Sequence, residues 1–146
     1  MTPKFRVWLK KEGNMAAIGD MHFKDGELYF IRLEQIAPIT YGTSWNHVPK
    51  HKSEDVVLMQ STGAKDKKGA EIFEGDIIEH RYNSPLSGEL VVHRFRVAWD
   101  EMYSRFCTIG IGLRHGVDLS SSASSRHFEV IGNIYENPEM LEEVEK

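Results

Sequence analysis

The stretch LMQSTGAKDKKGAEIFEGDIIE, residues Leu58–Glu79, decides the fold of this chain. An apolar run enters it, a polar loop with Gly63 and Gly69 interrupts it, and a second apolar segment leaves it through Glu74-Gly75-Asp76. Apolar runs separated by Gly and Asp are typical of short strands joined by tight turns, and not of a helix. The stretch therefore predicts a β-rich chain.

The same glycines invite comparison with a phosphate-binding loop. Such a loop ends in Gly-Lys-Ser/Thr and leads into a helix, whereas a strand pattern follows Gly75-Asp76 here. Gly110-Ile111-Gly112 fails as a dinucleotide fingerprint for the same reason, because no helix pattern follows it. We interpret these glycines as turn residues.

Upstream of this stretch, the chain predicts a first strand and a hairpin. Residues 4–9 (KFRVWL) alternate apolar and basic side chains, the period of a half-buried strand, and Trp8 would lie on its outward face. Two further β-like runs, Met15–Phe23 and Glu27–Leu33, flank Lys24-Asp25-Gly26. Asp-Gly between such runs predicts a hairpin, because both turn residues tolerate positive φ.

Residues 34–55 predict neither a helix nor a continuous strand, because prolines and glycine interrupt them. They hold two aromatic residues, Tyr41 and Trp45, which with Trp8 could anchor an interface. The alternative is that this segment folds back and buries Trp8 within the N-terminal lobe. Residues 50–55 resemble a solvated linker, so we expect an N-terminal β lobe over residues 1–52 and a second domain over residues 53–146.

The downstream half predicts a meander of strands that ends in a helix. Asn137 before Pro138 is typical of a helix start, and the helix should run to about Val144. We therefore expect a mainly β fold, α+β at most, with a small barrel-like C-terminal domain and a short terminal helix. The expected strands are Ile77–Tyr82, Leu90–Trp99, Phe106–Leu113 and Phe128–Tyr135.

Length and composition place the chain among ordinary globular proteins. It has 146 residues and one cysteine, Cys107, which excludes an internal disulfide framework and fits a reducing cytoplasm. No signal-peptide pattern opens the sequence, and no apolar run reaches the roughly 20 residues of a membrane span. We expect no membrane association.

Charge is distributed unevenly along the chain, whose net charge is −4. Residues 81–130 carry arginine and no lysine. If the strands around the Asp100-Glu101 turn pair, then Arg94, Arg96 and Arg105 could form one patch beside Tyr103, a surface suited to nucleic acid or protein. The alternative is an ordinary outer face with Arg–Glu pairs between strands.

No candidate catalytic or metal-binding set assembles in the sequence. His47 and His51 have a spacing that suits a metal on a helix, but Pro49 lies between them. Cys107 sits in an apolar strand pattern, where a small buried thiol is the commoner use. We expect no catalytic residue, no metal and no cofactor.

Three stretches together resemble the YopX family of phage and prophage proteins. The first is Lys4–Trp8, the second runs from Leu58 to Gly69 and on through Glu71–Ile78, and the third is EVIGNIYENPE at Glu129–Glu139. They stand in the family's order and span nearly the whole chain; Leu9 and Ala64 are small departures. The resemblance implies a β-rich fold with a barrel-like C-terminal domain, self-association, and a phage or prophage origin. It implies no known reaction.

These observations favour a non-enzymatic accessory or interaction module of unknown biochemical activity, acting as a homo-oligomer in the cytoplasm of a bacterial host cell. A phage or host protein is an alternative partner. Nucleic acid bound through the arginine face is a second hypothesis, less favoured because the chain is acidic overall. An enzyme with a site between the two lobes is a third.

Overall fold

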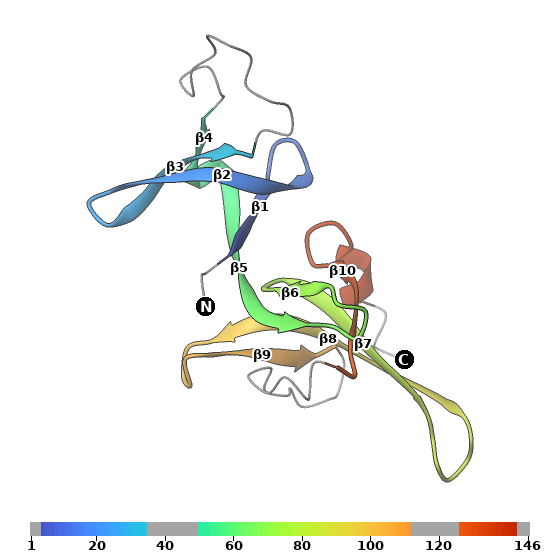
Figure 1. Cartoon of the computed structure of the whole chain (residues 1–146). Helices are drawn as coiled ribbons and strands as arrows, with labels where there is room; N and C mark the ends of the chain where they lie inside the picture. The colour runs from blue at the N-terminus through green and yellow to red at the C-terminus, as the bar shows by residue number, and fades with distance from the viewer. Residues whose placement is uncertain (1–3, 35–49, 112–125, 143–146) are drawn as a thin grey trace. The chain divides into compact units, whose positions relative to one another are not determined.

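The computed structural model describes residues 4–34, 50–111 and 126–142 (Figure 1). The chain divides into two compact units, Lys4–Met59 and a C-terminal unit that begins at Gln60. All long elements are antiparallel strands, so the predicted mainly β class is confirmed. The division falls within strand β5 (Val56–Lys65), which belongs partly to each unit. The expected linker is instead a short strand, β4 (His51–Lys52), and a 3-10 turn, η2 (Ser53–Asp55).

The N-terminal unit is an antiparallel sheet built around a tight hairpin. Its strands are β1 (Phe5–Leu9), β2 (Asn14–Lys24), β3 (Glu27–Leu33) and β4, in the order β4-β3-β2-β1-β5. Asp25 and Gly26 have φ angles of 53° and 83°, and Lys24 pairs with Glu27 across the turn. The predicted Asp-Gly hairpin is therefore confirmed, and its two central residues adopt the left-handed conformation that such turns require.

The core of this unit is formed by alternate residues of neighbouring strands. Val7 and Leu9 from β1 pack with Ile31 from β3 and Val56 from β5, and all four are buried. Alternation along a strand sends the intervening residues to the other face. Phe30, next to Ile31, accordingly lies on the face away from this core.

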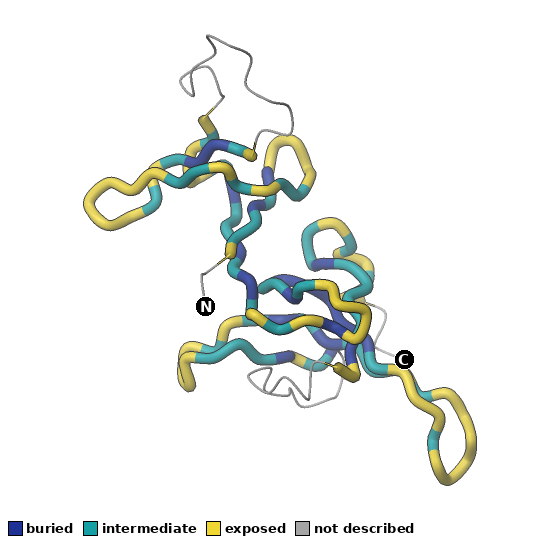
Figure 2. Tube along the Cα trace, in the orientation of Figure 1, coloured by how far each residue is buried: buried dark blue, intermediate teal, exposed yellow. Residues whose placement is uncertain are grey.

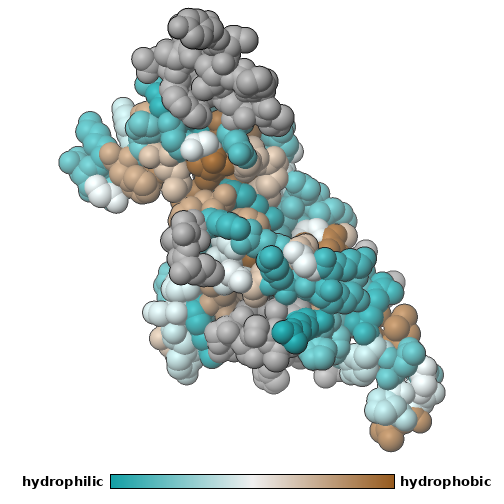
Figure 3. Space-filling model, in the orientation of Figure 1, coloured by the Kyte–Doolittle hydropathy of each residue, from teal (hydrophilic) through white to brown (hydrophobic). Residues whose placement is uncertain are grey.

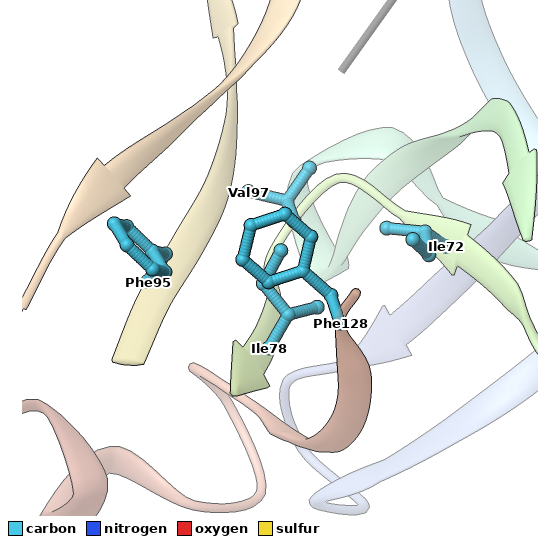
Figure 4. Packing of buried hydrophobic residues seen from close by; sticks show 5 residues of the cluster. All are labelled: Ile72, Ile78, Phe95, Val97 and Phe128. Atoms are coloured by element: carbon cyan, nitrogen blue, oxygen red, sulfur yellow. The ribbon is translucent and has the colours of Figure 1, made fainter. Parts of the chain in front are cut away.

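The C-terminal unit contains a four-stranded sheet in the order β10-β7-β8-β9 and the β5–β6 hairpin. Phe95 and Val97 of β8 pack with Ile78 of β7, Ile72 of β6 and Phe128 just before β10 (Figure 4). Burial of side chains of this size supplies most of the stability of such a unit. Its strands are β6 (Glu71–Phe73), β7 (Asp76–Asn83), β8 (Leu90–Asp100), β9 (Arg105–Gly110) and β10 (Glu129–Asn133).

Two details of this unit differ from the sequence prediction. The described strands form open sheets and no closed barrel, since β9 and β10 are the edges of a sheet of four strands. Up to Glu142, where the described residues end, the terminal helix is one 3-10 turn, η3 (Pro138–Leu141), and the expected helix end near Val144 lies outside them. Asn137 does not cap it: its side-chain Oδ1 instead accepts a hydrogen bond from the backbone N–H of Asn133 at 3.2 Å.

One buried carboxylate ties the loop between β5 and β6 to β10. Asp66 Oδ1 accepts hydrogen bonds from the backbone N–H groups of Lys68 (2.9 Å) and Ala70 (2.8 Å), and Oδ2 accepts one from Val130 (2.9 Å). The backbone N–H of Lys67 donates to the carbonyl of Phe128 at 2.9 Å. Burial acts to raise the pKa of Asp66, but these three N–H groups hold it below its ordinary value.

We expect Asp66→Ala to lower the free energy of unfolding of the C-terminal unit by about 3 kcal/mol, because three backbone donors lose a charged acceptor. The contribution should be constant above the ordinary aspartate pKa of 3.8 and should disappear as the pH falls through the lower pKa of the folded state. Urea unfolding followed by circular dichroism at about pH 7 and about pH 3 measures both effects.

The matched control for this experiment is Glu101→Ala, which removes an exposed acid from the β8–β9 turn. It should change the free energy of unfolding by less than about 0.5 kcal/mol. Equal destabilisation by the two variants would contradict the structural role assigned to Asp66.

Candidate interaction surfaces

The three arginines singled out in the sequence lie on one face of β8 and β9 but have different neighbours. The strand register places Arg94 opposite Glu79, Arg96 opposite Ile77, and Arg105 opposite Asp100. Opposed residues in an antiparallel pair point to the same side of the sheet. Acidic residues are therefore built into the same face as the arginines.

Glu79 is the acid that determines the charge of this face. It is only 5% exposed and lies between two arginines: Arg94 Nε donates to Glu79 Oε2 at 3.0 Å, and Arg81 Nε donates to Oε1. Burial acts to raise the pKa of Glu79, but its two arginine partners hold it below its ordinary value. One of the two positive charges is thus neutralised within the protein.

The predicted association of Arg105 with Tyr103 is present at the β8–β9 turn. The Arg105 guanidinium lies 4.9 Å from the centre of the Tyr103 ring, and its Nε lies 3.7 Å from Asp100 Oδ2. Tyr103 is exposed, as is neighbouring Met102. The Arg105–Tyr103 pair thus sits at the turn, whereas Arg94 lies further along the strand beside Glu79.

Among the three predicted interface aromatics, only Trp8 falls within the described residues. It is half-buried, on a strand whose neighbouring residues Val7 and Leu9 are in the core. Tyr41 and Trp45 lie outside the described residues, so their role as interface anchors stays a prediction.

A surface that the sequence prediction missed is the hairpin at the far ends of β7 and β8. We define the β7–β8 arm as residues 80–93. β10 pairs with β7 no further than Glu79, and the last bond from the β9 side joins the N–H of Ile111 to the carbonyl of Arg94. Beyond these points the hairpin continues with its own pairing from His80↔His93 to Asn83↔Leu90. In the described residues, the arm is therefore a ribbon of two strands that extends away from the rest of its sheet (Figure 1).

The arm is exposed and rich in apolar side chains. Leu86 at its tip is 99% exposed, and Tyr82, Leu90 and Val92 along its strands are also exposed. Figure 2 shows the arm as largely exposed, and Figure 3 shows hydrophobic residues among polar ones at its end. Isolated exposed apolar residues are common, but several on one projecting element indicate a binding surface.

The sequence predicted the two strands of the arm and the turn between them. The expected strands Ile77–Tyr82 and Leu90–Trp99 correspond to β7 and β8, and the expected loop at Asn83–Gly88 lies between them. The sequence could not show that this pair continues past β9 and β10, because that depends on where the neighbouring strands end.

Comparison with known proteins places the chain in a family. The family described as YopX protein matches residues 4–142. The chain belongs to the YopX family. The resemblance found in the sequence is thereby confirmed. This YopX protein is also similar in structure to a crystal structure of protein EF1440 from Enterococcus faecalis, with a TM-score of 0.64 and 30% identity over 97% of this chain and 99% of that one. The comparison with curated proteins gives no match.

Three histidines, His80, His93 and His127, lie at the base of the arm. The His80 ring lies 5.0 Å from the Tyr82 ring and 5.7 Å from the His127 ring, and the Tyr82 hydroxyl is 3.4 Å from His93 Nε2. Burial, together with the nearby His127, His93 and Lys67, lowers the pKa of His80. Across the described parts of the chain, no three His, Cys, Asp or Glu residues are grouped to hold a metal ion. Nor is any described helix long and apolar enough to cross a membrane.

We expect Arg94→Gln to lower the free energy of unfolding by about 2 kcal/mol, because it leaves the buried Glu79 carboxylate with one arginine fewer. Arg96→Gln, on the same strand and the same face, is the matched control and should cost less than about 1 kcal/mol. Urea unfolding of both variants at neutral pH measures the difference. If Arg96→Gln lowered the free energy of unfolding more than Arg94→Gln does, this would contradict our conclusion that Arg94 stabilises the buried Glu79 carboxylate.

Proposed function

We propose that this YopX protein is a non-enzymatic interaction module of phage or prophage origin that self-associates through the β7–β8 arm. The observation that carries this proposal is the exposed apolar surface of a ribbon that extends past both neighbouring strands. The origin, and a place in the cytoplasm of a bacterial host cell, rest on the family resemblance and on the single cysteine.

The geometry of the arm favours association because a ribbon of two strands is only marginally stable in water by itself. Past Glu79 and Arg94, the described strands leave one hydrogen-bonding edge of β7 and one of β8 without a neighbouring strand. Such edges are templates for pairing with another strand. A partner that covers the arm would satisfy these backbone groups and bury its apolar side chains together.

A second copy of this chain is the partner that the arm suits best. An arm that is apolar and has two similar edges is complementary to itself, and a two-fold axis through it would place the same residues on both sides of the interface. Leu86 and Leu90 of each copy would then be buried together, at about 1.5–3 kcal/mol for each leucine.

The buried acids of the C-terminal unit support a non-enzymatic role. Asp66 accepts bonds from three backbone N–H groups, Asp76 Oδ2 accepts one from Phe73, and Glu79 pairs with two arginines. Each of these carboxylates is used to hold the structure. A general acid or base instead needs a side chain within reach of a substrate proton.

We expect the double variant Leu86→Ser/Leu90→Ser to weaken self-association by about 10⁴-fold or more, because the dimer loses four buried leucines at about 1.5 kcal/mol or more each. Both residues are exposed in the single chain, so the fold should be unaffected. Sedimentation velocity over a concentration series measures the dissociation constant. Met102→Ser, which removes an exposed apolar side chain from the β8–β9 turn, is the matched control and should bind as the wild type.

Two results would overturn this proposal. The first is a wild-type chain that stays monomeric up to about 100 μM, since an interface of this kind should form below that concentration. The second is an oligomer whose dissociation constant the arm variant leaves unchanged, which would place the interface elsewhere.

A further inference from the structure

The N-terminal unit carries an aromatic and basic surface on the face of β3 opposite its core. Phe30 is at the centre of this surface, and the register places it opposite His22 of β2 and Lys52 of β4. The Phe30 and His22 rings are stacked, with centroids 4.3 Å apart and planes inclined by 16°. The ring of Tyr29 meets Phe30 edge to face at 5.7 Å.

Cationic groups surround these rings. Lys50 Nζ lies 4.8 Å and the Arg32 guanidinium carbon 5.1 Å from the centre of the Phe30 ring, and Lys24 Nζ lies 5.5 Å from the Tyr29 ring. Contacts of this kind are attractive because the face of an aromatic ring is negative. Three cations on two rings make this the most concentrated aromatic and basic surface in the described part of the chain.

Arg32 is fixed in place while the lysines are free to move. Its side chain is buried, and its Nη1 donates to Asp20 Oδ2 at 3.0 Å and lies 3.1 Å from His22 Nε2. Burial acts to raise the pKa of Asp20, but hydrogen bonds from His22 and Arg32 hold it below its ordinary value, so the carboxylate stays charged. Lys50 and Lys52 are exposed and can reorient toward a ligand.

A cavity of about 440 Å³ opens beside Phe30. Its size is within the range of pockets that hold small ligands. Among the described residues, its lining includes two aromatic residues, two lysines, one serine and one acidic residue, Glu54. Lys10 Nζ donates to the backbone carbonyl of Glu54 at 3.0 Å, so a further cation lies close to that residue. The lining residues are Tyr29, Phe30, Lys50, Lys52, Ser53 and Glu54.

We propose that this cavity binds single-stranded nucleic acid, with a base against the rings of Tyr29 and Phe30 and one phosphate at each of Lys50 and Lys52. A nucleotide is both planar and anionic, which matches a site made of rings and ammonium groups. Lys50 exchanges its contact with the Phe30 ring for a phosphate, and the ring that it leaves becomes available to a base. Base edges meet few fixed donors here, so the site does not select sequence strongly.

This site lies in the N-terminal unit and is separate from the arginine face of β8 and β9. In the C-terminal unit, the charges of Arg94 and Arg105 are balanced by acids at 3.0 and 3.7 Å. Around Phe30, the cations instead contact rings, and Asp20 is occupied by Arg32 and His22. Among the described residues, Glu54 is the only acidic residue that lines the Phe30 cavity, so phosphates meet less competition from protein carboxylates there.

The test is fluorescence anisotropy with a labelled oligothymidylate of about 15 nucleotides across a salt titration. For the double variant Lys50→Ala/Lys52→Ala we expect affinity to fall by about tenfold or more, and the slope of log affinity against log salt to shrink by about 1.4, or 0.7 for each lost phosphate contact. Tyr29→Ser should weaken binding by about tenfold with the slope unchanged, because it removes a stacking surface and no charge. Tyr29 and both lysines are exposed, so these variants should fold.

The matched control is Arg96→Gln/Arg105→Gln, which removes two positive charges from the C-terminal unit and should bind as the wild type. The proposal is overturned if the wild type does not bind at low salt, or if the arginine control loses affinity while the lysine variant does not. Thymidine monophosphate serves as competitor. Competition by this mononucleotide at the same concentration as the oligonucleotide would identify a free nucleotide as the ligand and overturn the assignment to a single strand.

Discussion

The carboxylate of Asp66 is the contact on which the C-terminal unit depends. It closes the turn between β5 and β6 through two backbone bonds and, through a third, fixes Val130 of β10 beside that turn. With β10 held beside this turn, Phe128 lies in the core with Ile72 and Ile78. A backbone amide has no charge and little reach, so a carboxylate with two oxygens is well suited to hold three backbone N–H groups from two segments at one point. Asp66 lies in the stretch Leu58–Glu79, which carries part of the family resemblance. This stretch thus also joins the loop after β5 to β10, the last strand of the unit.

Features set by local chemistry could be predicted from the sequence, and features set by pairing could not. The Asp25-Gly26 hairpin follows from two residues that tolerate positive φ, and the mainly β class follows from alternation along single strands. Pairing of β10 with β7 joins residues far apart in the chain, and no local pattern specifies that register. Asn137 shows the same limit: its sequence context indicates a helix cap, but its side chain bonds to Asn133, and the described residues after it form a 3-10 turn.

The same distinction between local pattern and strand pairing applies to the candidate surfaces. The sequence could place Arg94 and Arg96 on one face of a strand, because alternation alone decides that. It could not show that Glu79 lies between Arg81 and Arg94, since this depends on the register of β7 against β8. The Phe30 surface could not be predicted from the sequence, for a stronger reason. Three strands supply it, and Lys52 lies opposite Phe30 only because β4 pairs with β3.

The composition of the C-terminal core also determines when this protein can finish folding during its synthesis. Ile72, Ile78, Phe95 and Val97 leave the ribosome before Phe128, the last member of their cluster. At about 5 to 20 residues per second, the distance from Val97, the fourth member to emerge, to Phe128 corresponds to roughly 1.5 to 6 s of translation. Throughout that interval the sheet lacks both β10 and the aromatic side chain that covers its interior. The nascent chain thus presents an apolar face for several seconds, a period in which chaperones and neighbouring nascent chains compete for it.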